Sequence, residues 1–372
     1  MRDTVSSRRS PNRRRPTTVA SLVDDLARGD KRAAAKLISL IEDDEPEAEE
    51  ALSRIHPRTG HAYVIGFTGP PGVGKSSLIN RLVRSYRARG KKVGVIAVDP
   101  TSPFTGGAVL GDRIRMTETG TDPGVFIRSM ATRGHPGGLA LATFDAVRVL
   151  DALGMDIVFV ETVGAGQAEV EIATRAHTTV VVEMPLTGDA IQTLKAGILE
   201  IGDVYVVNKT DVGDPEALVA NLEFQLQPRD GWKPPIVKTC AMDDRGLPEL
   251  VLAIERHRRH LKATGLLRRK EIKRARTEIL ETTRRIVEER TREATYLTAA
   301  LDALAASVAE RKVDPRAAAS RLLAGVSRRP VPLPRPIRRR PKSSAGNVGS
   351  KREILRRIVR QRSRSQTSRS SR

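Results

Sequence analysis

The chain has 372 residues, a single cysteine and a formal net charge of +21 at neutral pH. One cysteine excludes an intrachain disulfide framework and a cysteine-based zinc site, and it fits a reducing compartment. No apolar run is long enough for a transmembrane helix, and no apolar segment follows the arginine-rich N-terminus as it would in a secretory signal. We therefore expect a cytoplasmic protein without a membrane partner.

The positive charge is concentrated at the two ends of the chain. Residues 1–16 carry a net charge of +5 and residues 328–372 carry +15, which leaves residues 17–327 near +1. Both ends are rich in Arg, Ser and Pro and poor in aromatic residues, so we expect disordered basic segments at 1–18 and 328–372. Solvated appendages are one interpretation, and attachment to nucleic acid through these tails alone is the other.

Between the tails, helical patterns come first and then alternate with short apolar runs. Residues 19–60 have helical apolar spacing, interrupted at Gly29-Asp30, and predict an N-terminal helical extension. Continuous apolar runs that alternate with helices are typical of a parallel sheet covered on both faces. We expect strands at Tyr63–Thr68, Val93–Val98, Val125–Arg128, Ile157–Val160, Thr179–Val182, Val204–Val207 and Ile236–Lys238. This order predicts a doubly wound, mostly parallel α/β domain over residues 61–262, with ligands at the carboxyl ends of the strands.

The chain becomes helical again after Leu247. Helical spacing covers Leu250–Lys262, the long charged stretch Arg268–Ala306, and a last segment from Pro315 to Leu323. The stretch Arg268–Ala306 is too charged for a core helix, which leaves a solvent-exposed arm or a dimerisation helix. We therefore assign residues 263–327 to a C-terminal helical dimerisation region.

The most informative motif lies directly after the expected strand Tyr63–Thr68. It has the form G-x-x-x-x-G-K-S, which between a strand and a helix is the signature of a phosphate-binding P-loop. Backbone N–H groups converge on phosphates at such a helix N-terminus, Lys75 is expected to reach the β- and γ-phosphates, and the Ser76 hydroxyl is expected to ligate Mg²⁺. The nucleotide-binding assignments are Gly69, Pro70, Pro71, Gly72, Val73, Gly74, Lys75, Ser76 and Ser77. The sequence therefore predicts a nucleoside triphosphate site.

A second motif, N-K-x-D, follows the expected strand Val204–Val207 and consists of Asn208, Lys209 and Asp211. The carboxylate of Asp211 can accept hydrogen bonds from N1–H and the exocyclic amine of guanine, a donor pattern that adenine lacks. A site built around such donors rejects analogues without them, so the motif predicts GTP as the nucleotide.

A third nucleotide-binding segment follows the expected strand Ile236–Lys238. Cys240, Ala241 and Met242 lie where GTPases usually have Ser-Ala, whose backbone N–H groups face the guanine oxygen. Cys240 takes the position of that serine, so the backbone contact is kept and a hydroxyl is lost. No base is identifiable beside Cys240, which favours a small, partly buried packing residue over a nucleophile.

Carboxylates and a glycine mark the expected metal and switch region. Glu161 and Gly164 lie in a segment similar to the Walker B and D-x-x-G elements, with Glu in place of Asp, so Glu161 can hold Mg²⁺ through water and the Gly164 N–H can sense the γ-phosphate. Ala165 stands where Ras-type GTPases place a water-orienting Gln, which predicts slow intrinsic hydrolysis. Asp99 at a strand end and Asp112 in a loop are further candidates for the metal and the nucleophilic water, with turn or helix-cap roles as the alternatives.

Together these motifs resemble the MeaB/ArgK (MMAA-like) family of SIMIBI-class P-loop GTPases. The resemblance covers roughly residues 19–325 and rests on the strings Thr68–Ser76, Val98–Ser102, Gly106–Met116, Phe126–His135, Val160–Gln167, Lys195–Glu200 and Val207–Asp211. It implies a GTP-hydrolysing chaperone that gates cofactor loading and protects or reactivates an adenosylcobalamin-dependent acyl-CoA mutase, usually methylmalonyl-CoA mutase. Adenosylcobalamin would belong to that client and not to this chain.

The resemblance also implies roles for particular residues. It places Asp99, Asp112 and Glu161 in the catalytic Mg²⁺ and switch region, beside the P-loop Lys75. It places Lys195 in an additional switch segment through which the client acts on the nucleotide site. It also implies a homodimer formed through the C-terminal helices. GTP hydrolysis is expected to be stimulated by the client.

Two features depart from the family pattern. Leu186 replaces a glycine in the P-G-x-G-D segment before Lys195, and the basic tail from Arg328 onward is not a recognised family feature. Three other functions stay open: a metal-insertion GTPase, a transport-linked kinase, and a nucleic-acid adaptor acting through the tails. The first needs a Cys/His cluster that a chain with one Cys and six His is poorly equipped to build.

Overall fold

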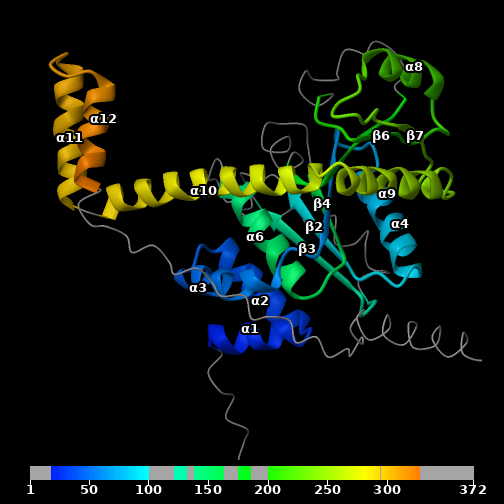
Figure 1. Cartoon of the computed structure of the whole chain (residues 1–372), viewed down its shortest axis with the longest axis horizontal. Helices are drawn as coiled ribbons and strands as arrows, with labels where there is room; N and C mark the ends of the chain where they lie inside the picture. Colours follow the sequence, from blue (N-terminus) through cyan, green and yellow to red (C-terminus); the bar gives the residue numbers. More distant parts are fainter. Residues whose placement is uncertain are drawn as a thin grey trace, which may run out of the picture. The chain divides into compact units, whose positions relative to one another are not determined.

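A wholly parallel sheet forms the centre of the part of the chain that the structure describes. The computed structural model describes residues 18–99, 121–131, 138–162, 175–185, 200–293 and 295–326. The strands lie in the order β3-β2-β4-β1-β5-β6-β7 (Figure 1). Each neighbouring pair is parallel, so the predicted doubly wound α/β fold is confirmed.

All the strands expected from the sequence are present. They are β1 (Tyr63–Thr68), β2 (Val93–Asp99), β3 (Val125–Ala131), β4 (Ile157–Thr162), β5 (Thr178–Glu183), β6 (Val204–Val207) and β7 (Ile236–Lys238). Several of them continue past the last apolar residue, so that Asp99, Glu161 and Glu183 belong to strands rather than to the loops that follow. The parallel ladder continues as long as a neighbour offers a partner, whether the side chain is apolar or charged.

Helices cover both faces of the sheet. On one face, α4 (Lys75–Ala88) and α9 (Leu247–Ala263) bury an apolar core against the sheet with residues such as Leu78 and Ile254. On the other face, α6 (Gly138–Ala152) packs on β2, β3 and β4, and α8 (Pro215–Gln225) packs on β6 and β7. Because both faces are covered, the strands are apolar along nearly their whole length.

The N-terminal extension consists of three helices, α1 (Val19–Ala27), α2 (Lys31–Glu42) and α3 (Pro46–Ile55), followed by the short η1 (His56–Arg58). Two of them, α2 and α3, pack against α6, while α1 packs against those two. Gly29 separates α1 from α2 with φ +88°, and the Asp30 carboxylate then caps α2 by accepting from Arg32 N at 2.7 Å. The predicted break at Gly29-Asp30 is therefore confirmed, because glycine adopts a positive φ without strain and aspartate is a favoured N-cap.

Three helices end the described part of the chain: α10 (Leu266–Glu293), α11 (Thr295–Ala309) and α12 (Pro315–Val326). Helices α11 and α12 lie side by side near the end of α10 (Figure 1). The predicted stretch Arg268–Ala306 is thus divided between α10, which is strongly charged, and α11, which is rich in Ala and Leu and packs on α12. Among the helices of the described residues, none combines the length and apolarity needed to cross a membrane.

Candidate nucleotide-binding site

The predicted P-loop joins the end of β1 to the start of α4. Gly69, Gly72 and Gly74 have φ values of +141°, +80° and +94°, which residues with a Cβ rarely adopt. A Cβ on Gly69 would lie 2.1 Å from the Val182 carbonyl oxygen of β5, so the loop and that strand are in direct contact. The sequence places glycine where the turn and this close approach require it.

Lys75 begins α4 and turns back over the loop that precedes it. Its Nζ donates to the carbonyl oxygens of Gly69 at 2.8 Å and Pro70 at 2.9 Å, and the residue is 5% exposed. The ammonium group therefore lies at the N-terminus of a helix, where the helix dipole and free N–H groups also favour an anion. This arrangement is suited to hold phosphate.

Two of the predicted metal ligands are in contact at the same edge of the sheet. Ser76 Oγ donates to Glu161 Oε1 at 2.6 Å, and Glu161, near the end of β4, is almost completely buried. A hydroxyl and a carboxylate that share one small space supply the hard oxygen donors that Mg²⁺ prefers. The residues present therefore fit Mg²⁺.

The other metal and switch assignments fall partly or wholly outside the described residues. Asp99 ends β2, and the register Val98↔Thr162 places its backbone at the same edge as Glu161, but its side chain is outside the described part. Asp112, Gly164 and Lys195 also lie outside the described residues, as do both basic tails apart from Thr18 at the end of the first.

Asn208 of the N-K-x-D motif connects two loops that the sequence places far apart. Its Nδ2 donates to the Val73 carbonyl oxygen of the P-loop at 2.8 Å, and its Oδ1 accepts from Thr239 Oγ1 at 2.9 Å. Asn208 is 1% exposed, so both ends of its amide group are satisfied within the protein interior. The phosphate-binding loop and the predicted guanine-binding segments are thereby held as one unit.

Asp211 and Cys240 lie together at the predicted guanine end of the site. Cys240 Sγ donates to Asp211 Oδ1 at 3.2 Å, and burial raises the pKa of the Cys240 thiol, which keeps it a neutral donor. Cys240 is buried rather than partly buried, while Met242 is strongly exposed. The thiol supplies a hydrogen bond at the position where GTPases usually have a serine hydroxyl.

One candidate residue at this edge was not identified from the sequence. Glu183 ends β5 beside the P-loop, and its backbone oxygen accepts from Asn208 N at 2.7 Å. Burial raises the pKa of its carboxyl to about 7, against the opposing effect of the nearby Lys75 ammonium. The signal that could have found it is a carboxylate directly after the apolar run Thr179–Val182, the same signal that identified Asp99.

Comparison with known proteins agrees with this geometry. A family model described as the methylmalonyl-CoA mutase-associated GTPase MeaB matches residues 34–296, more than half of the chain. The chain belongs to the MeaB family. It is therefore a member of a family of P-loop GTPases, as the P-loop and the N-K-x-D motif predict.

Similar proteins come from archaea, bacteria and animals. A Pyrococcus abyssi protein named as a GTPase is 47% identical over 311 residues, which cover 82% of this chain and 96% of that protein. The GTPase ArgK of Escherichia coli is 34% identical over 262 residues, covering 67% and 79%. A Caenorhabditis elegans protein named as a mitochondrial methylmalonic aciduria type A homolog is 34% identical over 255 residues, covering 62% and 64%.

A solved structure matches most of this MeaB-family chain. The crystal structure of a LAO/AO transport system kinase superposes with a TM-score of 0.62 at 25% sequence identity, covering 85% of this chain and 99% of that one. The match supports the α/β fold and extends beyond the sheet domain alone.

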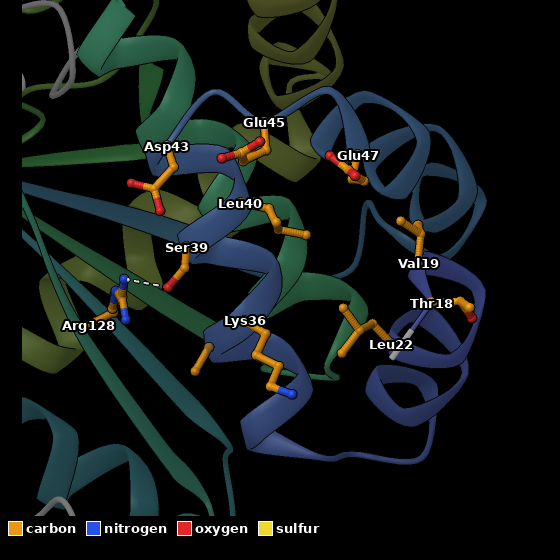
Figure 2. Close-up of a pocket in the computed structure, with 11 residues that line it drawn as sticks. Thr18, Val19, Leu22, Lys36, Ser39, Leu40, Asp43, Glu45, Glu47 and Arg128 are labelled. Carbon is orange, nitrogen blue, oxygen red and sulfur yellow. Dashed lines mark hydrogen bonds between the residues drawn. The ribbon is translucent and has the colours of Figure 1, made fainter. Parts of the chain in front are cut away.

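A separate cavity of about 750 Å³ lies between the N-terminal helices and β3 of this MeaB-family protein (Figure 2). Arg128 on β3 donates to Ser39 Oγ of α2 at 3.1 Å and also pairs with Glu42. None of the residues that line the cavity belongs to the P-loop or to the guanine-binding segments. These contacts attach the N-terminal extension to the sheet, and the cavity is no part of the candidate nucleotide site.

Proposed function

We propose that this protein is a GTP-hydrolysing chaperone for an adenosylcobalamin-dependent acyl-CoA mutase, with methylmalonyl-CoA mutase as the expected client. In this role it gates cofactor loading and protects or reactivates the client. The observation that carries the proposal is the contact of Asn208 with Val73, which joins a P-loop to a guanine-type motif in a chain of the MeaB family. The client is supported by the family description and by the name of the nematode relative.

The proposed nucleotide is GTP with Mg²⁺. Lys75 contacts the β- and γ-phosphates, Ser76 and Glu161 hold the metal together with Asp99 and Asp112, and Asp211 selects guanine. When bound, Mg²⁺ neutralises charge on the phosphates. Cys240 orients the Asp211 carboxylate through the bond from Sγ to Oδ1, while Ala241 and Met242 line the base with Lys209.

The proposed hydrolysis is slow until the client binds. The reaction is an in-line attack of water on the γ-phosphate, and Ala165 cannot orient that water as a glutamine would. Gly164 senses the γ-phosphate, and the Lys195 segment transmits the effect of the client. Binding of the client would complete the site, as an activating partner does for other GTPases.

We further propose that the protein is a cytoplasmic homodimer formed through the C-terminal helices. Support comes from α10, on which Ile272, Ile279 and Ile286 follow one another at seven-residue intervals and are exposed. A repeat of this kind on one face of a helix is suited to packing against another helix. The client, and not this chain, carries adenosylcobalamin in this proposal.

The test is GTP and ATP hydrolysis by the purified full chain, with and without methylmalonyl-CoA mutase from the same organism. The expected result is slow turnover of GTP alone, accelerated by the mutase. GTP turnover that ignores the mutase would refute the client while leaving the GTPase, and equal turnover of ATP would refute the guanine assignment.

A kinase is the second candidate function, because the chain is similar to a solved protein named a LAO/AO transport system kinase. A kinase passes the γ-phosphate to an acceptor, whereas a GTPase passes it to water. Radiolabelled GTP separates these outcomes, because label on a protein or small acceptor indicates a kinase and label in inorganic phosphate indicates a GTPase. We favour the GTPase, because the matching family is described as one of GTPases.

A further inference from the structure

The helix α10 has an unusual distribution of polar and apolar side chains. Apart from Leu267, which packs against the core at the start of the helix, the residues for which a contact with the rest of the protein is defined are charged and recur at helical spacing: Lys270, Arg274, Glu278, Glu281 and Arg285. Its large apolar residues Ile272, Ile279, Leu280 and Ile286 are exposed instead. No side chain between residues 266 and 288 is fully buried. Beyond its first turn, α10 is therefore held to the protein mainly by ionic contacts between Lys270 and Arg285.

The central ionic contacts of α10 form a compact group beside the ring of Phe144. Its charged members are Arg148, Arg175, Glu278 and Glu281. Arg148 of α6 pairs with Glu278, and Arg175 pairs with Glu281. The guanidinium of Arg175 lies 5.9 Å from the centre of the Phe144 ring, and its side chain is 5% exposed. Ion pairs with so little solvent depend strongly on geometry, because a displaced partner leaves a buried charge uncompensated.

Arg175 connects α10 to the segment that leads into β5. It lies three residues before β5 and follows Gly164 by eleven residues in the sequence. Lys270 Nζ of α10 also donates to the carbonyl oxygen of His177, at the start of the same strand, at 3.0 Å. The other end of β5 contacts the P-loop, since Val182 leaves no room for a Cβ on Gly69. One short strand therefore has α10 at its beginning and the phosphate-binding loop at its end.

We propose that Arg175 is a positioning residue that couples the state of the nucleotide to α10 through its ion pair with Glu281. The inference rests on the proposed function, since it requires that GTP and GDP bind at the P-loop. A change at the nucleotide shifts Arg175, and Glu281 then follows or loses its partner. By linkage, any molecule that binds the apolar face of α10 more tightly in one nucleotide state changes the affinity for that nucleotide by the same factor.

The experiment compares hydrogen exchange of the α10 amides between 266 and 288 in the full chain bound to GDP and to a non-hydrolysable GTP analogue. For the wild type we expect protection to differ between the two states by about 5- to 150-fold, the usual range of allosteric coupling. In Glu281→Gln, which removes the charge with little change of shape, the difference should fall to less than about twofold, the scatter expected without coupling.

Glu278→Gln is the matched control. It is the same substitution on the same helix at a similar burial, but it breaks the pairs with Arg148 of α6 and with Arg274 of α10 itself and leaves Arg175 and Glu281 intact. Exchange should become faster in both nucleotide states, while the ratio between the states persists. A merely structural role of Glu281 predicts the same result for both variants.

Three outcomes would overturn the coupling. The first is equal protection of the wild-type α10 amides in the GDP and GTP-analogue states. The second is a protection ratio between the two states that persists in Glu281→Gln. The third is loss of that ratio in Glu278→Gln to the same extent as in Glu281→Gln. Binding of a fluorescent GTP analogue is measured on the same samples. A chain that binds no GTP refutes the proposed function and the coupling together, whereas GTP binding with unchanged exchange refutes the coupling alone.

Discussion

Gly74→Ala should damage the protein more than Gly72→Ala, although both residues lie in the P-loop with positive φ. A Cβ at Gly72 meets nothing within 4 Å, whereas a Cβ at Gly74 would lie 2.4 Å from Asn208 Nδ2. Both substitutions impose left-handed backbone strain of about 1–2 kcal/mol. Only Gly74→Ala also displaces the amide that donates to Val73, and a buried polar group left unpaired costs about 1–3 kcal/mol.

The expected loss of unfolding free energy is therefore about 1–2 kcal/mol for Gly72→Ala and about 2–5 kcal/mol for Gly74→Ala. Denaturant unfolding can be followed through the fluorescence of Trp232, the single tryptophan, which packs against His257 and His260. Affinity for GTP should fall in the same order, because the P-loop and the guanine-binding segments lose their connection.

A double mutant isolates the contact. In an Asn208→Ala background the amide is absent, so adding Gly74→Ala should cost only the strain of about 1–2 kcal/mol. Equal losses for the two single glycine variants, or an undiminished effect of Gly74→Ala without Asn208, would refute the reasoning that this contact joins the two loops.

Three further outcomes test the site. Lys75→Ala should abolish GTP turnover, measured as phosphate release, because the cation held over the loop is lost. Asp211→Asn should weaken the preference for GTP over XTP in competition binding, and unchanged selectivity would contradict the guanine assignment. Glu183→Gln should alter the pH dependence of unfolding in the nucleotide-free protein. The folded state holds the Glu183 proton up to a pKa of about 7, against 4.5 for the ordinary carboxyl, so wild-type stability should decline between these pH values. The decline is on the order of 3 kcal/mol and should be absent from the variant; an identical pH profile would show that Glu183 is not the cause.

The strands and the nucleotide motifs were predictable from the sequence for local reasons. Buried parallel strands appear as apolar runs, as at Val204–Val207, and the P-loop needs glycine at fixed positions because its backbone adopts positive φ. Glu161 was predicted as a metal ligand because its segment is similar to the Walker B and D-x-x-G elements, and the structure brings it to Ser76. The guanine motif was predicted from spacing, but its contact with Val73 was not, because that contact joins segments 135 residues apart.

Glu183 shows where a local pattern was insufficient. The apolar run Thr179–Val182 was predicted as a strand, and Glu183 directly follows it, as Asp99 follows the run Val93–Val98. The strand order is needed to place Glu183 near the nucleotide site, since β5 lies next to β1 and therefore ends beside the P-loop. A carboxylate at the end of an edge strand such as β7 would have lain far from Lys75.

The orientation of helix α10 could not be predicted from the sequence, for a different reason. Its charge led to the prediction of an exposed arm or a dimerisation helix, on the assumption that charged residues face solvent and apolar residues face the protein. In the structure, Glu278 and Glu281 face the protein because Arg148 and Arg175 neutralise them there, while Ile279 is left exposed. The heptad of isoleucines on α10 could be read from the sequence, but which face it lies on could not, since the deciding arginines come from α6 and from the residues before β5. Because a displaced partner leaves a poorly solvated charge uncompensated, Glu281 has to follow Arg175 when Arg175 moves. In the proposed homodimer the outward apolar face would pack against another helix, and the proposed coupling through the inward charged face would make the position of that surface depend on the nucleotide.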